Sequence, residues 1–319
     1  MEISKAIEKA REFILIRRDN MGLWADFRSR NHRESIDWVS SYVGLSLLRA
    51  GASLADLELT AESMSKRQNE SGGWGYNKET SAPDADSTAF SIQFLSRFGY
   101  KAEIEKAKRF LLQHQRDNGG FGTYLAELIR LDYKERIPVD TPLDGWCSAI
   151  PEVTAIALQA LPDNERAIEY MKQSQNEGGF WRSYWYNSDI YATVQVIKSL
   201  QDNKYEEKIK KAQEWLAGQK PEMSFYLALL VRGIRNNTKY TDKTDSGISN
   251  LLNLQKEDGG WESHPILRVP SFSNLRPWED SSRWREDISD QNRIFTTATC
   301  LETIFDYKEH TLHRLGIAS

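Results

Sequence analysis

The stretch that decides the fold is Gln68-Asn69-Glu70-Ser71-Gly72-Gly73-Trp74-Gly75-Tyr76. It follows an amphipathic segment and contains two consecutive glycines. Glycine adopts a positive φ without a steric clash, so this pair lets a helix stop and the chain reverse tightly. The stretch therefore predicts the end of one helix and a tight turn that leads into the next element.

The same turn recurs along the chain as Gln, three variable residues, Gly-Gly and an aromatic residue. Further copies begin at Gln115 and Gln255. The copy at Gln175 reads one residue shorter, with Gly178-Gly179-Phe180. Degenerate copies, which lack the Gly-Gly pair, begin at Arg18 and Gln219. A motif that recurs in this way is typical of one structural unit per copy.

Each copy ends an amphipathic segment and precedes a more apolar one. The amphipathic segments have one charged face and are expected to be outer helices: 3–17, 54–67, 102–115, 163–175, 204–219 and 242–256. The apolar segments are expected to be inner helices: 36–49, 86–98, 152–161, 189–201, 222–235 and 291–306. The pairs predict an all-α fold, an (α/α)6 barrel (toroid) of six inner and six outer helices, with residues 1–319 as a single domain.

Composition limits the classes of function. The 319 residues carry a formal net charge of −4, which disfavours a nucleic-acid partner. No run approaches the roughly 20 apolar residues of a membrane span, and the N-terminus is polar, so neither an integral membrane segment nor a secretory signal is expected. The widely separated Cys147 and Cys300 fit a cytoplasmic location. The sequence leaves a homodimer open.

One acidic motif occurs only once, and it opens the second inner segment: Pro83-Asp84-Ala85-Asp86-Ser87-Thr88-Ala89. An aspartate at a helix N-terminus is ordinarily a cap, and the helix dipole favours its anion. Two carboxylates this close cannot both ionise cheaply, and burial in an apolar barrel would raise their pKa values further. Asp86 and Asp84 are therefore candidate catalytic residues, with helix capping alone as the alternative.

The repeated turn resembles the repeat of the prenyltransferase and squalene-cyclase family, and the acidic motif resembles the Asp-x-Asp-Asp-Thr-Ala motif of class II terpene cyclases. The resemblance implies that Asp86 is a general acid with Asp84 as its partner. Such an acid protonates an alkene or epoxide of an isoprenoid substrate, and a carbocation cascade then closes rings without metal or cofactor. Ser87 departs from the motif, because many members carry a third Asp there. Class II cyclases also usually join two barrels, whereas this chain has room for one.

Aligning the inner segments on the step Thr88-Ala89 places one residue of each segment level with Asp86. The predicted layer is Trp38, Asp86, Glu152, Tyr191, Glu222 and Phe295. Aromatic ring faces stabilise positive charge. We therefore expect Trp38, Tyr191 and Phe295 to surround a substrate cation, with Glu152 beside them. A barrel that is simply filled by these aromatic residues is the alternative.

Two loops add further candidates for substrate binding. Trp181 and Trp185 belong to an aromatic run after the fourth turn, and Trp146 lies in the long segment 122–150. All three are expected to form a pocket wall at the mouth where the inner helices begin. The longest connection, 262–289, contains arginines that would bind an anionic group of the substrate or pair with neighbouring acids: Arg268, Arg276, Arg283 and Arg285.

Other functions fit the same barrel. A carbohydrate-active enzyme would use Asp86 with Glu152 or Glu222 as its separated carboxylates. A non-catalytic scaffold would bind a ligand or a protein, and its acids would be exposed caps. The protein prenyltransferases bind zinc, and Asp144 with Cys147 resembles part of their ligand set. The spacing differs, however, and no His occurs in 291–306, so no metal site is expected.

Overall fold

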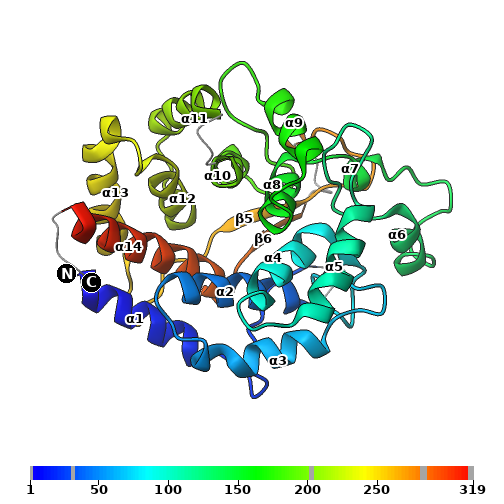
Figure 1. Cartoon of the computed structure of the whole chain (residues 1–319), viewed down its shortest axis with the longest axis horizontal. Coiled ribbons are helices and arrows are strands. Elements are labelled where there is room, and N and C mark those ends of the chain that lie inside the picture. Colours follow the sequence, from blue (N-terminus) through cyan, green and yellow to red (C-terminus); the bar gives the residue numbers. More distant parts are fainter. Residues whose placement is uncertain (1–2, 30–32, 201–204, 281–285, 315–319) are drawn as a thin grey trace.

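The computed structural model describes residues 3–29, 33–200, 205–280 and 286–314, and its helices form two concentric rings (Figure 1). The inner ring consists of α2 (Asp37–Arg49), α4 (Ala85–Leu95), α8 (Pro151–Ala160), α10 (Asp189–Ser199), α12 (Ser224–Ile234) and α14 (Ile294–Arg314). The outer ring consists of α1 (Ile3–Leu15), α3 (Glu58–Lys66), α5 (Lys101–Gln113), α9 (Glu165–Ser174), α11 (Glu206–Gly218) and α13 (Thr241–Leu254).

The inner ring is closed. Each inner helix packs against the next one in sequence, and the last helix, α14, packs against both α12 and the first inner helix, α2 (Figure 1). The outer helix α1 packs against α14, so the two ends of the chain meet in the ring. This arrangement confirms the predicted barrel of alternating outer and inner helices.

The turn of the repeat has the backbone that its glycines predict. Gly72 has a φ of 106°, and the first glycine of the other Gly-Gly turns is likewise left-handed. The Gln68 amide donates to the carbonyl of Gly72 and to that of Glu103 in the next outer helix, each over 2.8 Å. The indole N–H of Trp74 donates to the carbonyl of Met64 at 2.8 Å. Each turn therefore links its own outer helix to the following one.

The fourth copy is not shortened, and that prediction was wrong. Gln175 donates to the carbonyl of Gly179, and Gly179 has the positive φ. The indole of Trp181 donates to Met171 over 2.8 Å, as Trp74 does to its own helix. Trp181 is thus the aromatic residue of this copy, and Phe180 stands where the other copies have their second glycine.

In five of the repeats, a buried hydroxyl joins the turn to the inner helix that follows it. Thr88 accepts the backbone N–H of Trp74 at 3.0 Å, and Thr154 accepts that of Phe121 at 2.8 Å. The same bond recurs at three further inner helices, made by Ser40, Thr193 and Thr297. These equivalent bonds confirm the alignment of those helices on the Thr-Ala step.

The middle of the barrel is filled with aromatic side chains. The rings of Tyr42 and Phe295 stack with centroids 3.9 Å apart, and Phe225 lies 5.7 Å from Phe295. Tyr42 meets Phe90 edge to face at 5.4 Å. This plug leaves hollow space at the two ends of the barrel, where the inner helices begin and where they end.

Short hairpins and helices cover the end at which the inner helices begin. The hairpins pair β1 (Asp26–Arg28) with β2 (Glu34–Ser35), β3 (Trp74–Gly75) with β4 (Pro83–Asp84), and β5 (Pro265–Val269) with β6 (Glu286–Ser289). The short helices include α6 (Ala126–Asp132) and α7 (Asp144–Cys147). The segment 262–289 was expected to be a loop, but in its described part β5 and β6 form an antiparallel hairpin.

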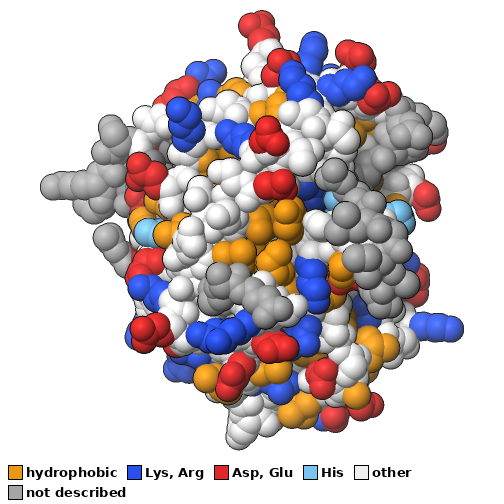
Figure 2. All heavy atoms as spheres, turned by 90° about the vertical axis from the view of Figure 1, so that its left-hand side faces the viewer, with side chains coloured by type: hydrophobic (Ala, Val, Ile, Leu, Met, Phe, Trp, Pro, Cys, Tyr) orange, Lys and Arg blue, Asp and Glu red, His pale blue; other side chains and the backbone are white. Residues whose placement is uncertain are grey.

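The outer surface is mixed in charge. Figure 2 shows one flank of the barrel with acidic and basic side chains interspersed over it, as expected for outer helices with a solvated face. Among the residues that the structure describes, no helix is both long enough and apolar enough to cross a bilayer.

Candidate active site

Asp84 caps the N-terminus of α4 with both of its carboxylate oxygens. Its backbone is extended, and Oδ1 accepts the backbone N–H of Ser87 at 2.8 Å. Oδ2 accepts the hydroxyl of the same serine at 2.9 Å. Thr88 donates to the carbonyl of Asp84 at 2.6 Å, which fixes the entry of the chain into the helix. The capping interpretation is therefore correct for Asp84.

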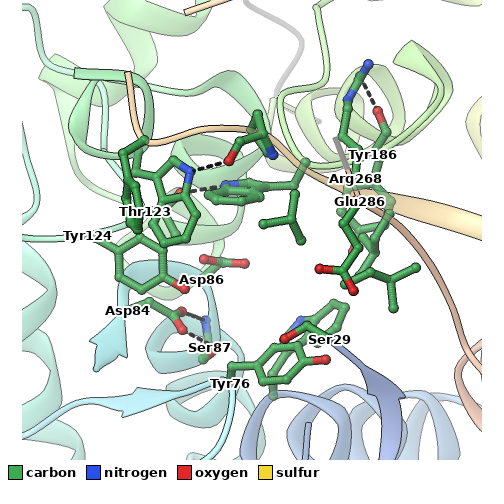
Figure 3. Close-up of a pocket in the computed structure, with 18 of the residues that line it drawn as sticks. Ser29, Tyr76, Asp84, Asp86, Ser87, Thr123, Tyr124, Tyr186, Arg268 and Glu286 are labelled. Carbon is green, nitrogen blue, oxygen red and sulfur yellow. Dashed lines mark hydrogen bonds between the residues drawn. The ribbon is translucent and has the colours of Figure 1, made fainter. Parts of the chain in front are cut away.

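Asp86 is placed differently. It is the second residue of α4, and its side chain points into open space above the Asp84–Ser87 cap (Figure 3). Its Oδ1 is buried and has no hydrogen-bond partner within the described chain. Burial raises the pKa of Asp86, and burial together with the neighbouring Asp86 carboxyl raises the pKa of Asp84. The pair therefore retains a proton at pH values where an exposed aspartate is ionised.

The open space is a cavity of about 460 Å³ at the end of the barrel where the inner helices begin. This volume lies in the range of roughly 300–1,000 Å³ that is usual for ligand pockets. Asp84, Asp86 and Ser87 line it on one side, and residues of β5 and β6 line it on the other (Figure 3). Its aromatic lining residues are Trp38, Tyr76, Tyr124, Tyr133, Trp146, Trp185, Tyr186 and Phe272.

The aromatic wall opposite α2 is built from the connections between the barrel helices, including the short helix α7. The ring of Trp146 lies 4.2 Å from Phe272 and 5.4 Å from Trp185. The indole of Trp185 donates to the hydroxyl of Thr123 at 2.7 Å, and Tyr124 stacks on Trp146 at 5.3 Å. Trp146 and Trp185 thus lie in the pocket wall at the end of the barrel where the sequence placed them.

Several lining residues were missed by the sequence analysis. Tyr124 directs its hydroxyl toward the two aspartates, and Glu286 of β6 points into the cavity from the far side (Figure 3). Burial raises the pKa of Tyr124 well above its usual value, so it stays neutral there. Tyr76 donates its hydroxyl to the carbonyl of Phe27 at 2.6 Å. Tyr76 and Tyr124 follow the aromatic residue of their turns by two and three positions, which is the signal that could have found them.

The predicted layer is brought together only in part. Trp38 lines the cavity, and its ring lies 4.8 Å from that of Phe295. Phe295 and Tyr191 are fully buried behind the lining residues, and Tyr191 stacks on Tyr186 with centroids 3.4 Å apart. Glu222 does not join the layer, because it is exposed and precedes the first residue of α12.

Glu152 holds the aromatic loop rather than facing the cavity. Its Oε1 accepts the backbone N–H groups of Tyr184 at 2.6 Å and Trp185 at 2.9 Å. Burial raises its pKa to about 7. Trp181 does not line the cavity either, because its indole is buried in the fourth turn. Both residues support the wall from behind.

The arginines of segment 262–289 have local partners. Arg268 is buried and donates to the carbonyls of Tyr184 at 3.0 Å and Ser183 at 2.8 Å. It thereby ties β5 to the aromatic loop. Arg276 forms an ion pair with Glu279 at 3.6 Å. Arg283 and Arg285 lie outside the described residues.

The sequence of the chain is similar to those of known proteins. The family profile described as "Squalene-hopene cyclase C-terminal domain" matches residues 46–224, more than half of the chain. The squalene-hopene cyclase of Schizosaccharomyces japonicus is 27% identical over 143 residues, which are 40% of this chain and 21% of that protein. The chain spans less than a third of the length of the curated relatives it matches.

Solved structures match along nearly the whole chain. The type II terpene cyclase MstE from Scytonema is 25% identical, with a TM-score of 0.87 over 96% of this chain and 99% of that one. A variant of MstE has been solved with geranylgeranyl dihydroxybenzoate, described as its substrate. An α-1,6-mannanase of Salegentibacter is 10% identical with a TM-score of 0.57, which is a likeness of fold alone. The chain described here belongs to the squalene-hopene cyclase C-terminal domain family.

Proposed function

We propose that the protein is a class II terpene-cyclase-like enzyme in which Asp86 protonates an alkene or epoxide of a prenyl chain. The observation that carries this proposal is a buried pair of carboxyl groups, Asp84 and Asp86, at the wall of a cavity lined by aromatic rings. The reaction needs a strong acid held away from bulk water, next to an apolar chain. The likeness to MstE supports it.

The hydrogen bonds of the pair indicate which aspartate carries the reactive proton. Asp84 accepts two hydrogen bonds from Ser87, and bonds of this kind stabilise its anion. Asp86 has a buried oxygen without a partner, which favours its neutral form. We therefore propose that Asp86, the member that points into the cavity, delivers the proton that the pair retains (Figure 3).

The aromatic wall would stabilise the cation that protonation creates. Trp38 lies on the α2 side of the cavity, and Trp146 with Trp185 lies on the loop side. The faces of such rings attract a cation when water is excluded. After ring closure, loss of a proton from a neighbouring carbon returns a neutral alkene, so the overall reaction is an isomerisation.

The substrate in this proposal is an isoprenoid chain attached to a polar head, by analogy with geranylgeranyl dihydroxybenzoate in MstE. The cavity has an apolar wall of rings but also contains Tyr76, Tyr124 and Glu286, which would contact a polar head. We further propose that residues 1–319 form a single barrel domain, because their inner helices close into one ring.

The carbohydrate-active alternative loses its proposed partners for Asp86. Glu152 is occupied by the backbone of the aromatic loop, and Glu222 is exposed outside α12. The non-catalytic alternative requires exposed acids, whereas Asp84 is buried and Asp86 lines a cavity.

Replacement of Asp86 by Asn tests the proposal. Asn keeps the shape of the side chain but has no acidic proton, so cyclisation of geranylgeranyl dihydroxybenzoate should fall by roughly 10²–10⁴-fold. Asp258→Asn on the protein surface is the matched control and should keep wild-type turnover. Product formation is followed by liquid chromatography with mass spectrometry. Wild-type turnover by the folded Asp86→Asn protein would remove the acid role.

A further inference from the structure

A second cavity lies at the opposite end of the barrel, where the inner helices end. Its volume is about 680 Å³, and residues from all six inner helices line it. The aromatic plug of Tyr42, Phe225 and Phe295 fills the barrel between the two ends. The second cavity is polar where the first is aromatic, so it suits a different kind of molecule.

The described lining of this cavity has an excess of positive charge. Its cationic residues are Arg49, Lys198, Arg232 and Arg235, and its acids are Glu302 and Asp306. The described lining thus has four basic side chains and two acidic ones. Such an excess in a recess focuses positive potential on its interior and attracts anions.

The acids already have partners. Glu302 accepts the hydroxyl of Ser46 at 2.9 Å, and its two oxygens lie 3.3 Å from Arg49 and from Arg232. Burial would raise the pKa of Glu302, but Arg232 and Arg49 outweigh it and lower that pKa to about 2. Asp306 pairs with Arg235. Glu302 and Asp306 also act on Lys198 through their charge, but neither forms an ion pair with it.

Lys198 is the group that this arrangement leaves unexplained. It lies in the last turn of α10, half-buried, and it forms neither an ion pair nor a hydrogen bond in the described part of the chain. Burial, with Arg49 beside it, lowers its pKa well below the usual value. Basic residues near helix C-termini often offset the helix dipole by meeting the last carbonyls. Lys198 makes no such contact, so the dipole does not account for it.

We propose that this cavity binds a small phosphate-bearing anion, with Lys198 as the central contact and Arg49 and Arg235 at its sides. A phosphate group would supply the negative charge that the lining lacks and would accept hydrogen bonds from an ammonium and from guanidinium groups. Because the ligand would touch the ends of several inner helices at once, its binding would also stabilise the folded barrel.

Titration calorimetry of the full-length protein with inorganic diphosphate tests this inference, with the melting temperature as a second readout. Wild-type protein should bind diphosphate saturably and melt at a higher temperature in its presence. Lys198→Met should weaken binding at least tenfold. It should also raise the melting temperature without ligand, because Met removes a half-buried amino group that has no hydrogen-bond partner. Exposed Lys101 in α5 provides the control, and Lys101→Gln should bind as the wild type does.

The Asp86→Asn variant distinguishes binding in the second cavity from binding in the first. It should leave diphosphate binding unchanged, whether or not the proposed cyclisation is correct. A changed affinity in that variant, tighter binding included, would place the anion in the first cavity and overturn the inference. Failure of wild-type protein to bind diphosphate would also overturn it, as would wild-type affinity in Lys198→Met. Should Lys198→Met fail to fold, Arg235→Gln decides in the same way, with at least tenfold weaker binding expected.

Discussion

Glu152 and Trp185 are joined by a hydrogen bond of 2.9 Å from the backbone N–H of the tryptophan to the carboxylate oxygen Oε1. The same oxygen accepts the N–H of Tyr184 at 2.6 Å. A residue of inner helix α8, aligned with Asp86 of α4, thus anchors the loop that supplies the opposite wall of the cavity. Asp86 and the aromatic wall opposite it are therefore both positioned by residues at the same level of the inner helices.

Glu152→Ala should damage that wall far more than Glu152→Gln does. Alanine leaves two buried N–H groups without an acceptor, at a cost of roughly 1–3 kcal/mol for each. Glutamine keeps a carbonyl oxygen in the place of Oε1. We expect Glu152→Ala to lower the midpoint of urea unfolding and to raise KM for the prenyl substrate. The Gln variant should stay near the wild type in both, and equal losses in the two variants would contradict the anchoring role.

Ser87→Ala should slow the proposed protonation without unfolding the protein. It removes the hydroxyl that donates to Oδ2 of Asp84 at 2.9 Å, and a hydrogen bond to a charged group contributes about 1.5–3 kcal/mol. Asp84 then competes better for the shared proton, so the rate of cyclisation should fall by roughly tenfold or more. Single-turnover rates measure this loss. Ser91→Ala, one turn further along α4, removes a bond to the Ser87 carbonyl instead and should have little effect on the rate.

Gly72→Ala should destabilise the barrel more than Gly99→Ala. Both glycines have a positive φ, of 106° and 81°, and a residue with a Cβ is strained there by roughly 1–2 kcal/mol. At Gly72 the added Cβ would also lie 2.9 Å from the carbonyl oxygen of Lys106, whereas nothing lies within 4 Å at Gly99. Chemical denaturation should therefore give a loss of roughly 2–5 kcal/mol at Gly72 and of roughly 1–2 kcal/mol at Gly99.

The free energy of unfolding should fall as the pH rises from 4 to 8, in part because of Asp26 and Asp290 at the start of α14. Burial raises the pKa of Asp26 to about 6 and that of Asp290 to about 7, with Asp26 contributing to the second shift. A raised pKa means that the folded state holds the proton more tightly than the unfolded state. The resulting stability is complete below about pH 4 and is lost as the pH passes through 6 to 7.

Asp290→Asn should flatten this dependence by roughly 1–3 kcal/mol between pH 4 and 8, measured by urea denaturation at each pH. Asp258→Asn is the control. Arg293 lowers the pKa of Asp258, so the stability that its ionised form contributes is lost only as the pH falls below 4. An unchanged slope in Asp290→Asn would show that other buried acids cause the fall.

The sequence predicted the barrel well because its signals are local. Helix periodicity placed the twelve helices of the two rings, and the repeated turn predicted the end of each outer helix to within a few residues. The last inner helix, α14, runs past the predicted end at 306 to Arg314. The fourth copy was misaligned because Gly178-Gly179 imitates the Gly-Gly pair, although Gly179 is the first glycine of the turn and Phe180 follows it. Because of this misalignment, Trp181 was predicted to line the pocket.

The cavity was harder to predict because its wall depends on contacts between distant segments. β5 pairs with β6 across the long connection, and Arg268 of β5 reaches the carbonyls of Ser183 and Tyr184. Neither helix periodicity nor the repeated turn predicts contacts between such distant segments. The acids were found because they occupy the first turn of an inner helix, whereas Phe272 and Glu286 enter the cavity from outside the repeat.

The contact of α1 with α14 has a consequence for folding during synthesis. Helix α1 leaves the ribosome long before α14, its neighbour in the folded barrel, so the apolar face of α1 stays uncovered while the intervening helices are made. Closing so long a loop slows folding, and a growing chain with an open flank is prone to aggregate. We therefore expect nascent chains that end before Ile294 to require a chaperone, while released chains that include α14 close the ring without one.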